Sequence, residues 1–297
     1  MPTHKVLSGP RHHQVEICYE VVTHFNQQQQ EELNERRSIV LTLGGHKGVK
    51  AARNVAMILS FKLKATVVIW DRRNTHDSGV CYGNQPLVLD DVEDLKAVIE
   101  ALSLAPTLLM GSSSGARVSA ICALKYPSLV SGLVLAPPTG GNIARTIAEA
   151  YYEVPAQIAV SRGMKQVVID NDNYVELCQT SKAALISDVS VEQFCRTMQL
   201  SSDWLKMHEK DTLLGIRDDE LTRLAIFRPL IVHDGNIQDP FHTVQTAVGC
   251  ARILQCSEIK LIPGILQQTE KSSELIALAI HQTYFLQNCK CKLSSLL

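Results

Sequence analysis

The sequence lacks a charge excess, a high aromatic content and any long apolar run. Its 29 basic and 30 acidic residues give a formal net charge of −1, with no lysine- or arginine-rich stretch. Neither this balance nor an aromatic content of 5% favours a nucleic-acid surface, which needs basic patches or stacking rings. No apolar run approaches the roughly 20 residues of a membrane-spanning helix. We therefore expect neither a nucleic-acid partner nor a membrane span.

Cysteine is present without a pattern. The nine cysteines are scattered, and an odd number without regular spacing argues against a disulfide framework and for a reducing compartment. Cys289 and Cys291 flank a lysine, but no Cys or His pair at zinc-site spacing accompanies them. The beginning of the chain, MPTHKVLSGPRHHQ, lacks the apolar core of a signal peptide. These features predict a cytoplasmic protein without a metal, and they leave the oligomeric state open.

Short apolar runs alternate with helical patterns along the two ends of the chain. Alternation of this kind is typical of a mostly parallel sheet flanked by helices on both faces. The predicted strands are 14–22, 38–43, 65–70, 106–110, 131–138, 228–235 and 258–264, and the predicted helices are 49–61, 90–102, 115–127, 242–255 and 272–286.

The middle of the chain has a different pattern. From about residue 142 to 225 no strand-like run stands out, whereas stretches such as IARTIAEAYYEVPAQIAV and VEQFCRTMQL have helical periodicity. We therefore expect one α/β core, formed by residues 1–141 and 226–297, that is interrupted by a helical cap, residues 142–225.

The stretch TLLMGSSSGARVSA, residues 107–120, places a Gly-x-Ser-x-Gly motif between a strand and a helix. In a nucleophile elbow the serine stands on a tight turn whose neighbours must be small, and Gly111 and Gly115 meet that need around Ser113. The turn also sets Ser113 at a helix N-terminus, and the Ser114 N–H becomes an oxyanion donor. The alternative is an ordinary turn in which Ser113 only caps the helix.

A second glycine-rich turn, LGGHKG at residues 43–48, follows the strand 38–43. The backbone N–H of Gly45 or His46 in this turn is the candidate for the second oxyanion donor. A glycine turn that serves only close packing is the alternative.

Together these motifs resemble the α/β-hydrolase superfamily, over about residues 38 to 286. The narrower resemblance is to members with an Asp-Arg-Arg-Asn turn, here at 71–74, a Thr-Gly-Gly before the cap, here at 139–141, and a tyrosine pair early in it, here at 151–152. The resemblance implies a serine, acid and histidine triad in that chain order. Arg72 and Arg73 would then either bind an anionic substrate group or form internal ion pairs.

The resemblance places the acid after the strand 228–235. Asp239, in GNIQDPFH, is the first candidate and Asp234 the second, although an aspartate before proline is also common in simple turns. The triad histidine should follow the strand 258–264, but that loop has none, and the next histidine, His281, falls within a predicted helix.

Three other histidines could take the serine proton. His242 lies three residues after Asp239, His46 lies in the glycine-rich turn, and His76 follows the Asp-Arg-Arg-Asn turn. We rank His242 first, since it is beside the candidate acid. Each of these histidines has a purely structural alternative. His242 could cap a helix or pack against it, His46 could face solvent, and His76 could be an ordinary residue of a surface turn.

Two functions fit this sequence. The first is a serine hydrolase that cleaves an ester, an amide or a carbon–carbon bond next to a carbonyl in a small molecule, without a cofactor. The second is a catalytically impaired protein of the same fold that binds a small ligand or a partner, which the missing loop histidine favours.

Overall fold

The central sheet of the molecule is built from strands whose side chains are buried on both faces. The computed structural model describes residues 3–9, 14–24, 37–170, 186–236, 238–256 and 259–286. Its eight strands lie in the order β1-β2-β4-β3-β5-β6-β7-β8. The first two pair antiparallel, and β2 pairs antiparallel with β4, whereas all other neighbours are parallel. The strands are β1 His4–Ser8, β2 Val15–Val22, β3 Ser38–Thr42, β4 Thr66–Trp70, β5 Thr107–Gly111, β6 Val130–Leu135, β7 Leu230–His233 and β8 Ile259–Leu261.

All seven predicted strands are present, with ends that shift by a few residues. The strand β1 was not predicted, because its short sequence HKVLS carries only two apolar residues. It is an edge strand held by its backbone pairing with β2, and this long-range contact leaves little trace in local composition.

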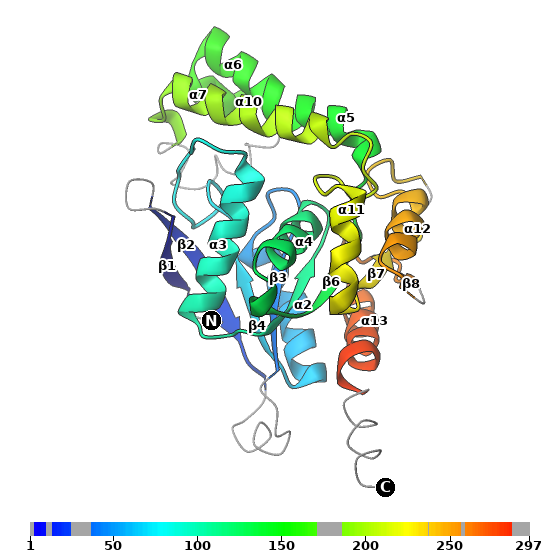
Figure 1. Ribbon diagram of the computed structural model, residues 1–297. Coiled ribbons are helices and arrows are strands. Elements are labelled where there is room, and N and C mark those ends of the chain that lie inside the picture. The colour runs from blue at the N-terminus through cyan, green and yellow to red at the C-terminus, as the bar shows by residue number, and fades with distance from the viewer. Residues whose placement is uncertain are drawn as a thin grey trace, which may run out of the picture.

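Helices cover both faces of the sheet (Figure 1). One face packs against α2 Val49–Leu63 and α13 Glu270–Ile280. The other packs against α3 Leu87–Ala101, α4 Ser114–Lys125 and α12 Val244–Ile253. Short helices η1 Pro127–Leu129, η2 Gly141–Ile143 and η5 His281–Phe285 complete the connections.

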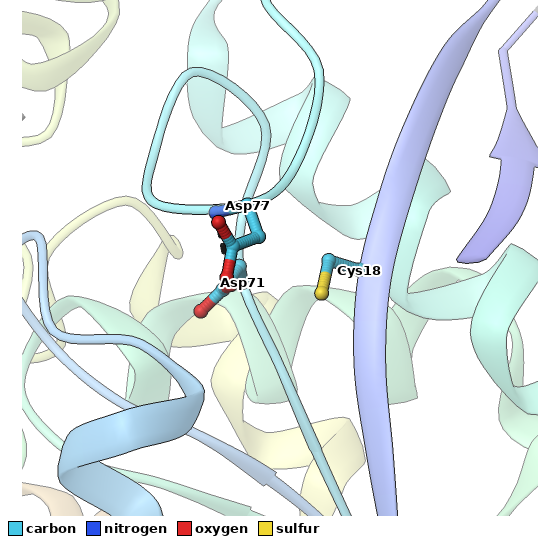
Figure 2. A group of neighbouring side chains, drawn as sticks. All are labelled: Cys18, Asp71 and Asp77. Atoms are coloured by element: carbon cyan, nitrogen blue, oxygen red, sulfur yellow. Dashed lines mark hydrogen bonds between the residues drawn. The ribbon is translucent and has the colours of Figure 1, made fainter. Parts of the chain in front are cut away.

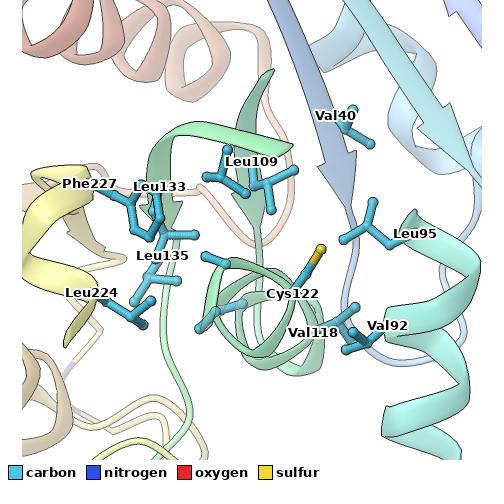
Figure 3. Packing of buried hydrophobic residues seen from close by; sticks show 14 of the residues in the cluster. Val40, Val92, Leu95, Leu109, Val118, Cys122, Leu133, Leu135, Leu224 and Phe227 are labelled. Atoms are coloured by element: carbon cyan, nitrogen blue, oxygen red, sulfur yellow. The ribbon is translucent and has the colours of Figure 1, made fainter. Parts of the chain in front are cut away.

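Successive side chains of a strand point to opposite faces of the sheet, so they pack into the two hydrophobic cores in turn. Ile39 and Leu41 of β3 join the cluster with α2 and α13, whereas Val40 between them joins the cluster with α3 and α4. Figure 3 shows Val40 and Leu109 facing Leu95 of α3 and Cys122 of α4. Burial on both faces explains why these strands are continuous apolar runs in the sequence.

The chain reverses direction across the sheet at β3. It passes from β3 to β4 on one side and then returns to β5 on the other side, so β3 lies between the two. Thr42 at the end of β3 pairs with Gly111 at the end of β5. The loops after these two strands therefore meet at the carboxyl edge, at the point where ligands bind in sheets of this kind.

A layer of helices lies over this edge. The helical layer consists of α5 Ala144–Ala148, the π-helix η3 Glu149–Glu153, α6 Val154–Arg162, α7 Met164–Asp170 and α10 Val191–Met207. Figure 1 shows the layer across one end of the sheet. Two side chains of α10 attach it to the core, because Ser201 accepts from the Leu87 N–H at 3.0 Å and Thr197 donates to the Gly83 carbonyl at 2.6 Å.

The helical layer ends earlier than the predicted cap, 142–225. Helix α11 Asp218–Leu221 and helix η4 Thr222–Phe227 lie beside the sheet. Leu224 and Phe227 pack in the same core cluster as Leu133 of β6 (Figure 3). Helical periodicity alone does not tell which neighbour a helix packs against, and the layer that covers the edge stops at Met207. No helix in the described ranges is both long and apolar enough to cross a membrane.

Candidate active site

Ser113 stands on a strained turn between β5 and α4. Its backbone has φ 53° and ψ −123°, and its N–H donates to the Pro137 carbonyl at 2.9 Å. A Cβ on Gly111 would lie 2.2 Å from the Gly115 carbonyl oxygen, and a Cβ on Gly115 would lie 2.1 Å from the Thr42 carbonyl oxygen. Both positions therefore require glycine, and strain of this type is typical of a functional turn. The turn has the backbone geometry of the predicted elbow.

The glycine-rich turn after β3 rests against this serine. A Cβ on Gly44 would lie 2.4 Å from the Ser113 Cβ, so only glycine allows the close approach. The N–H of Gly45 donates to the Ser114 Oγ at 3.1 Å. The Ser114 N–H, by contrast, makes no backbone hydrogen bond to the part of the chain that the structure describes. The Ser114 N–H is thus left without a backbone partner among the described residues, while its hydroxyl accepts a hydrogen bond from the neighbouring turn.

His46 and His76 do not have the environment of a general base. His46 is half-buried, with both ring nitrogens shielded from solvent, and its ring lies 6.0 Å from the ring of Tyr151. Burial, with the charge of Arg72 and the proximity of His76, lowers the pKa of His46 to about 3. The ring of His76 hydrogen-bonds to the His46 carbonyl oxygen through Nε2 and is not part of the pocket lining. His76 therefore holds the glycine-rich turn in place, and His46 stays neutral.

Asp239 and His242 form a hydrogen-bonded pair in the loop after β7. The Asp239 Oδ2 accepts from His242 Nδ1 at 2.8 Å, and its Oδ1 accepts the N–H groups of Phe241 and His242 at 2.8 and 3.2 Å. Partial burial would raise the pKa of Asp239, but these hydrogen bonds outweigh it and the pKa is lowered. Asp239 is therefore ionised, and it fixes the proton of His242 on Nδ1.

The other nitrogen of His242 faces the pocket that contains Ser113. His242 is 8% exposed, and its Nε2 is buried without a hydrogen-bond partner among the described residues. Both His242 and Ser113 line one pocket of about 460 Å³. No hydrogen bond joins Nε2 to the Ser113 Oγ in the structure, as is common in ligand-free sites whose catalytic bonds tighten on binding.

His233 supports this pair, a role that its sequence position did not suggest. It ends β7, it is buried, and its Nε2 donates to the His242 carbonyl at 2.9 Å. Its Nδ1 accepts the Gly235 N–H at 2.9 Å, which fixes the tautomer. The side chain is thus packed at the end of the strand and also holds the backbone of His242. Asp234, the second candidate acid, has no hydrogen bond or ion pair with His242 and does not line the pocket.

Gln268 lies in the loop after β8, where the superfamily resemblance placed a histidine. It has a φ of 54°, lines the pocket and has a buried Oε1 without a partner within the described ranges. An amide does not take up a proton at neutral pH, so Gln268 serves as a hydrogen-bonding group and not as a base. His281 lies at the start of η5, away from this pocket.

The pocket carries several charges besides the catalytic candidates. Arg72 pairs with Asp91 at 3.2 Å, and Arg73 forms a bidentate pair with Asp94 at 2.7 and 2.8 Å. The two arginines thus form the internal ion pairs that were one of the predicted alternatives. A third arginine, Arg117 of α4, also lines the pocket. Helices of the layer close the pocket with Ile147, Tyr151 and Tyr152.

A cluster of Cys18, Asp71 and Asp77 lies beside the glycine-rich turn (Figure 2). Both oxygens of Asp71 already accept backbone N–H groups, from Val49 at 2.7 Å and from Asp77 at 3.2 Å. These bonds fix the start of α2, which is the role that we assign to the cluster. The other candidate metal ligands, Cys289 and Cys291, lie outside the described residues.

Comparisons with known proteins find one matching family model and many solved structures of similar fold. A family model described as the Ndr family matches residues 74–204, less than half of the chain. A thermophilic esterase from Thermogutta terrifontis is 16% identical, with a TM-score of 0.62 over 96% of this chain and 100% of the other. A hydrolase from Sphaerobacter thermophilus is 19% identical, with a TM-score of 0.61 over 95% and 100%. The meta-cleavage product hydrolase of Pseudomonas fluorescens is 14% identical, with a TM-score of 0.59 over 94% and 97%. No curated protein matches the sequence.

Proposed function

The chain has the α/β-hydrolase fold, and from this premise we propose that it is a serine hydrolase acting on a small molecule. The single observation that carries the proposal is the state of His242. Its Nδ1 is bonded to an ionised carboxylate, while its buried Nε2 has no partner in the described structure and shares a pocket with Ser113. Such a nitrogen is available to take the serine proton.

The chemistry follows from these atoms. The Ser113 Oγ attacks a carbonyl carbon while its proton moves to His242 Nε2, and the imidazolium is stabilised by Asp239. The Ser114 N–H, at the start of α4, and the glycine-rich turn face the developing oxyanion. The proton on Nε2 then passes to the leaving group. Water then attacks the acyl-serine while His242 Nε2 takes its proton, and the acid is released.

The cap and the pocket suggest the size of the substrate. A pocket of about 460 Å³ suits a small molecule, and its lining is part apolar, through Val88, Ile147 and Leu266 among others. Esters, amides and carbon–carbon bonds next to a carbonyl all fit the same machinery. Among the structural neighbours, one is named an esterase and another a meta-cleavage product hydrolase.

One observation favours a second candidate function, a ligand-binding protein with impaired chemistry. The loop after β8 presents Gln268 and not a histidine, and Ser113 has no hydrogen bond to His242. In that case the pocket would hold a small molecule without turnover.

Labelling by a fluorophosphonate separates the two functions, because this reagent reacts only with an activated serine. We expect the purified protein to be labelled at Ser113 and the Ser113→Ala variant to remain unlabelled. The matched control is Ser112→Ala, since Ser112 is the neighbouring serine and its Oγ only accepts the Gly44 N–H at 3.3 Å. Absence of labelling in the folded parent protein would overturn the hydrolase proposal and favour the binding protein.

A further inference from the structure

Arg117 lies in the first turn of α4, four residues after the candidate nucleophile Ser113, which stands on the turn before this helix. Both residues line the pocket. A ligand whose carbonyl lies at Ser113 therefore has the guanidinium within reach of its far end.

Two of the three guanidinium nitrogens of Arg117 are buried without a partner in the described structure. The residue is 4% exposed, and its Nε and Nη1 are buried without a hydrogen bond to any described residue. No carboxylate within the described ranges lies within ion-pair distance of it, in contrast to Arg72 and Arg73 in the same pocket. Burial lowers the pKa of Arg117, yet a guanidinium keeps its charge in proteins. The protein thus holds, beside its pocket, a cation that has no ion-pair partner among the described residues.

The remaining charges of the pocket do not neutralise this cation. Asp91 is the only acidic residue among those described in the lining, and it is already paired with Arg72. Burial raises the pKa of Asp91 to about 6. Lys47 adds another positive charge, with its Nζ bonded to the Leu266 carbonyl at 3.2 Å. The lining is therefore positive overall.

Two neutral donors face the same pocket without partners. Asn74 Nδ2 and Thr139 Oγ1 are both buried and lack a hydrogen bond to the described chain. A buried polar group without a partner costs free energy, so three such groups around one pocket indicate that a ligand supplies the acceptors. Gly215, in the segment after the helical layer, approaches the stem of Arg117 closely, because a Cβ on it would lie 2.8 Å from Arg117 Cδ and 2.1 Å from the ring of Trp204.

We propose that Arg117 is the anchor of a carboxylate-binding subsite, and that the preferred substrates are half-esters or half-amides of small dicarboxylic acids. The inference rests on the proposed hydrolase function for its reaction, but not for its binding. A carboxylate is favoured over a phosphate because it carries the single charge that one guanidinium balances, and its two oxygens match the planar fork of arginine. The distal carboxylate binds at Arg117, and the ester carbonyl then lies at Ser113.

The kinetic test uses pairs of esters that differ only in the distal charge. The monoethyl esters of succinate, glutarate and adipate are compared with ethyl butyrate, pentanoate and hexanoate by acid release. We expect kcat/KM to favour at least one acidic ester by about tenfold, and Arg117→Met to lower that value by about 30-fold or more. The neutral esters should change less than threefold. Lys125→Met, which removes a cation of the same helix that pairs with Glu93 and does not line the pocket, should keep the preference.

A binding test separates failure of the subsite from failure of the hydrolase. Glutarate and adipate should raise the Tm of both the parent protein and Ser113→Ala, and should not raise that of Arg117→Met. Stabilisation without turnover of any ester would keep the subsite and overturn the hydrolase. Turnover of neutral esters with no preference and no stabilisation would keep the hydrolase and overturn the subsite. Equal stabilisation by inorganic phosphate would overturn the assignment to carboxylates.

The ligand-free protein offers a third measurement. Replacing a buried, unpaired charge by an apolar side chain of similar shape commonly stabilises a protein. We therefore expect Arg117→Met to have a higher Tm than the parent protein without ligand, although it loses the response to dicarboxylates. Arg117→Lys keeps the charge without the fork and should show a weaker response. A lower Tm for Arg117→Met together with an unchanged response to dicarboxylates would contradict the proposal.

Discussion

His242 and Asp239 form their 2.8 Å hydrogen bond within a single turn of the β7 loop, three residues apart. Under the proposed mechanism the acid and the base therefore come from one loop, and the loop after β8 contributes Gln268 to the pocket instead of a histidine. The proposal gives the proton transfer to His242 and not to His46 or His76, and this can be tested directly.

Replacing His242 by glutamine should lower turnover of a simple ester by about 10²- to 10⁴-fold, because the serine loses its proton acceptor. His281→Gln is the matched control, since this histidine lies in η5 away from the pocket. Ester hydrolysis and the rate of fluorophosphonate labelling both measure the effect. Equal rates for the two variants would exclude His242 as the base.

Removing the ring nitrogens of His233 should disturb the position of the hydrogen-bonded pair Asp239 and His242. In His233→Leu the His242 carbonyl and the Gly235 N–H lose their partners, and a buried group left unpaired costs about 1–3 kcal/mol. We expect a lower free energy of unfolding in urea and slower labelling of Ser113. A variant with the parent's stability and labelling rate would show that His233 does not position the loop.

Gly115 should tolerate no side chain. A methyl group there would lie 2.1 Å from the Thr42 carbonyl oxygen, and the backbone has to move, so we expect Gly115→Ala to lose about 3 kcal/mol or more of stability. Gly235→Ala is the control, because its φ of 86° is strained but no atom lies within 4 Å, and the expected loss is only about 1–2 kcal/mol. Urea unfolding measures the free energy of unfolding of the two variants. Equal losses of stability would contradict the tight packing of the turn around Gly115.

The buried Asp91 should make stability fall as pH rises from about 4 to 6. Burial, opposed by Arg72, raises the pKa of Asp91 from 3.8 to about 6. Between these values the folded protein keeps a proton that the unfolded chain has lost, so the free energy of unfolding decreases with pH, by up to about 3 kcal/mol. Asp91→Asn lacks this dependence, and the difference between the two urea-unfolding series isolates it. Parallel pH series would contradict the shifted pKa of Asp91.

Local patterns in the sequence predict most of the core. The buried parallel strands are continuous apolar runs that stop at glycine, proline or aspartate, so β3 to β7 could be placed within a few residues. The helical layer is also predicted, but its end is not, because α11 and η4 have helical patterns and pack on the sheet. Only contacts distant in sequence distinguish a helix of the layer from a helix of the core.

The residues of the site likewise fall into those that are local in sequence and those that meet only after folding. The elbow around Ser113 and the pair of Asp239 and His242 are local in sequence, and both could be suggested from spacing. Their catalytic roles remain predictions. The hydrogen bonds of His233 and the unpaired guanidinium of Arg117 depend on which side chains meet after folding. A strand histidine and a helical arginine give no signal in the sequence for such roles.

The position of the acid and the base on one loop has a mechanical consequence. In a triad divided between two loops, two segments have to arrive in register before a proton can be transferred. Under the proposed mechanism, a substrate that draws His242 toward Ser113 would also move Asp239, because hydrogen bonds join the two side chains and tie Asp239 to two backbone N–H groups. The proposed catalytic unit would then assemble in a single displacement.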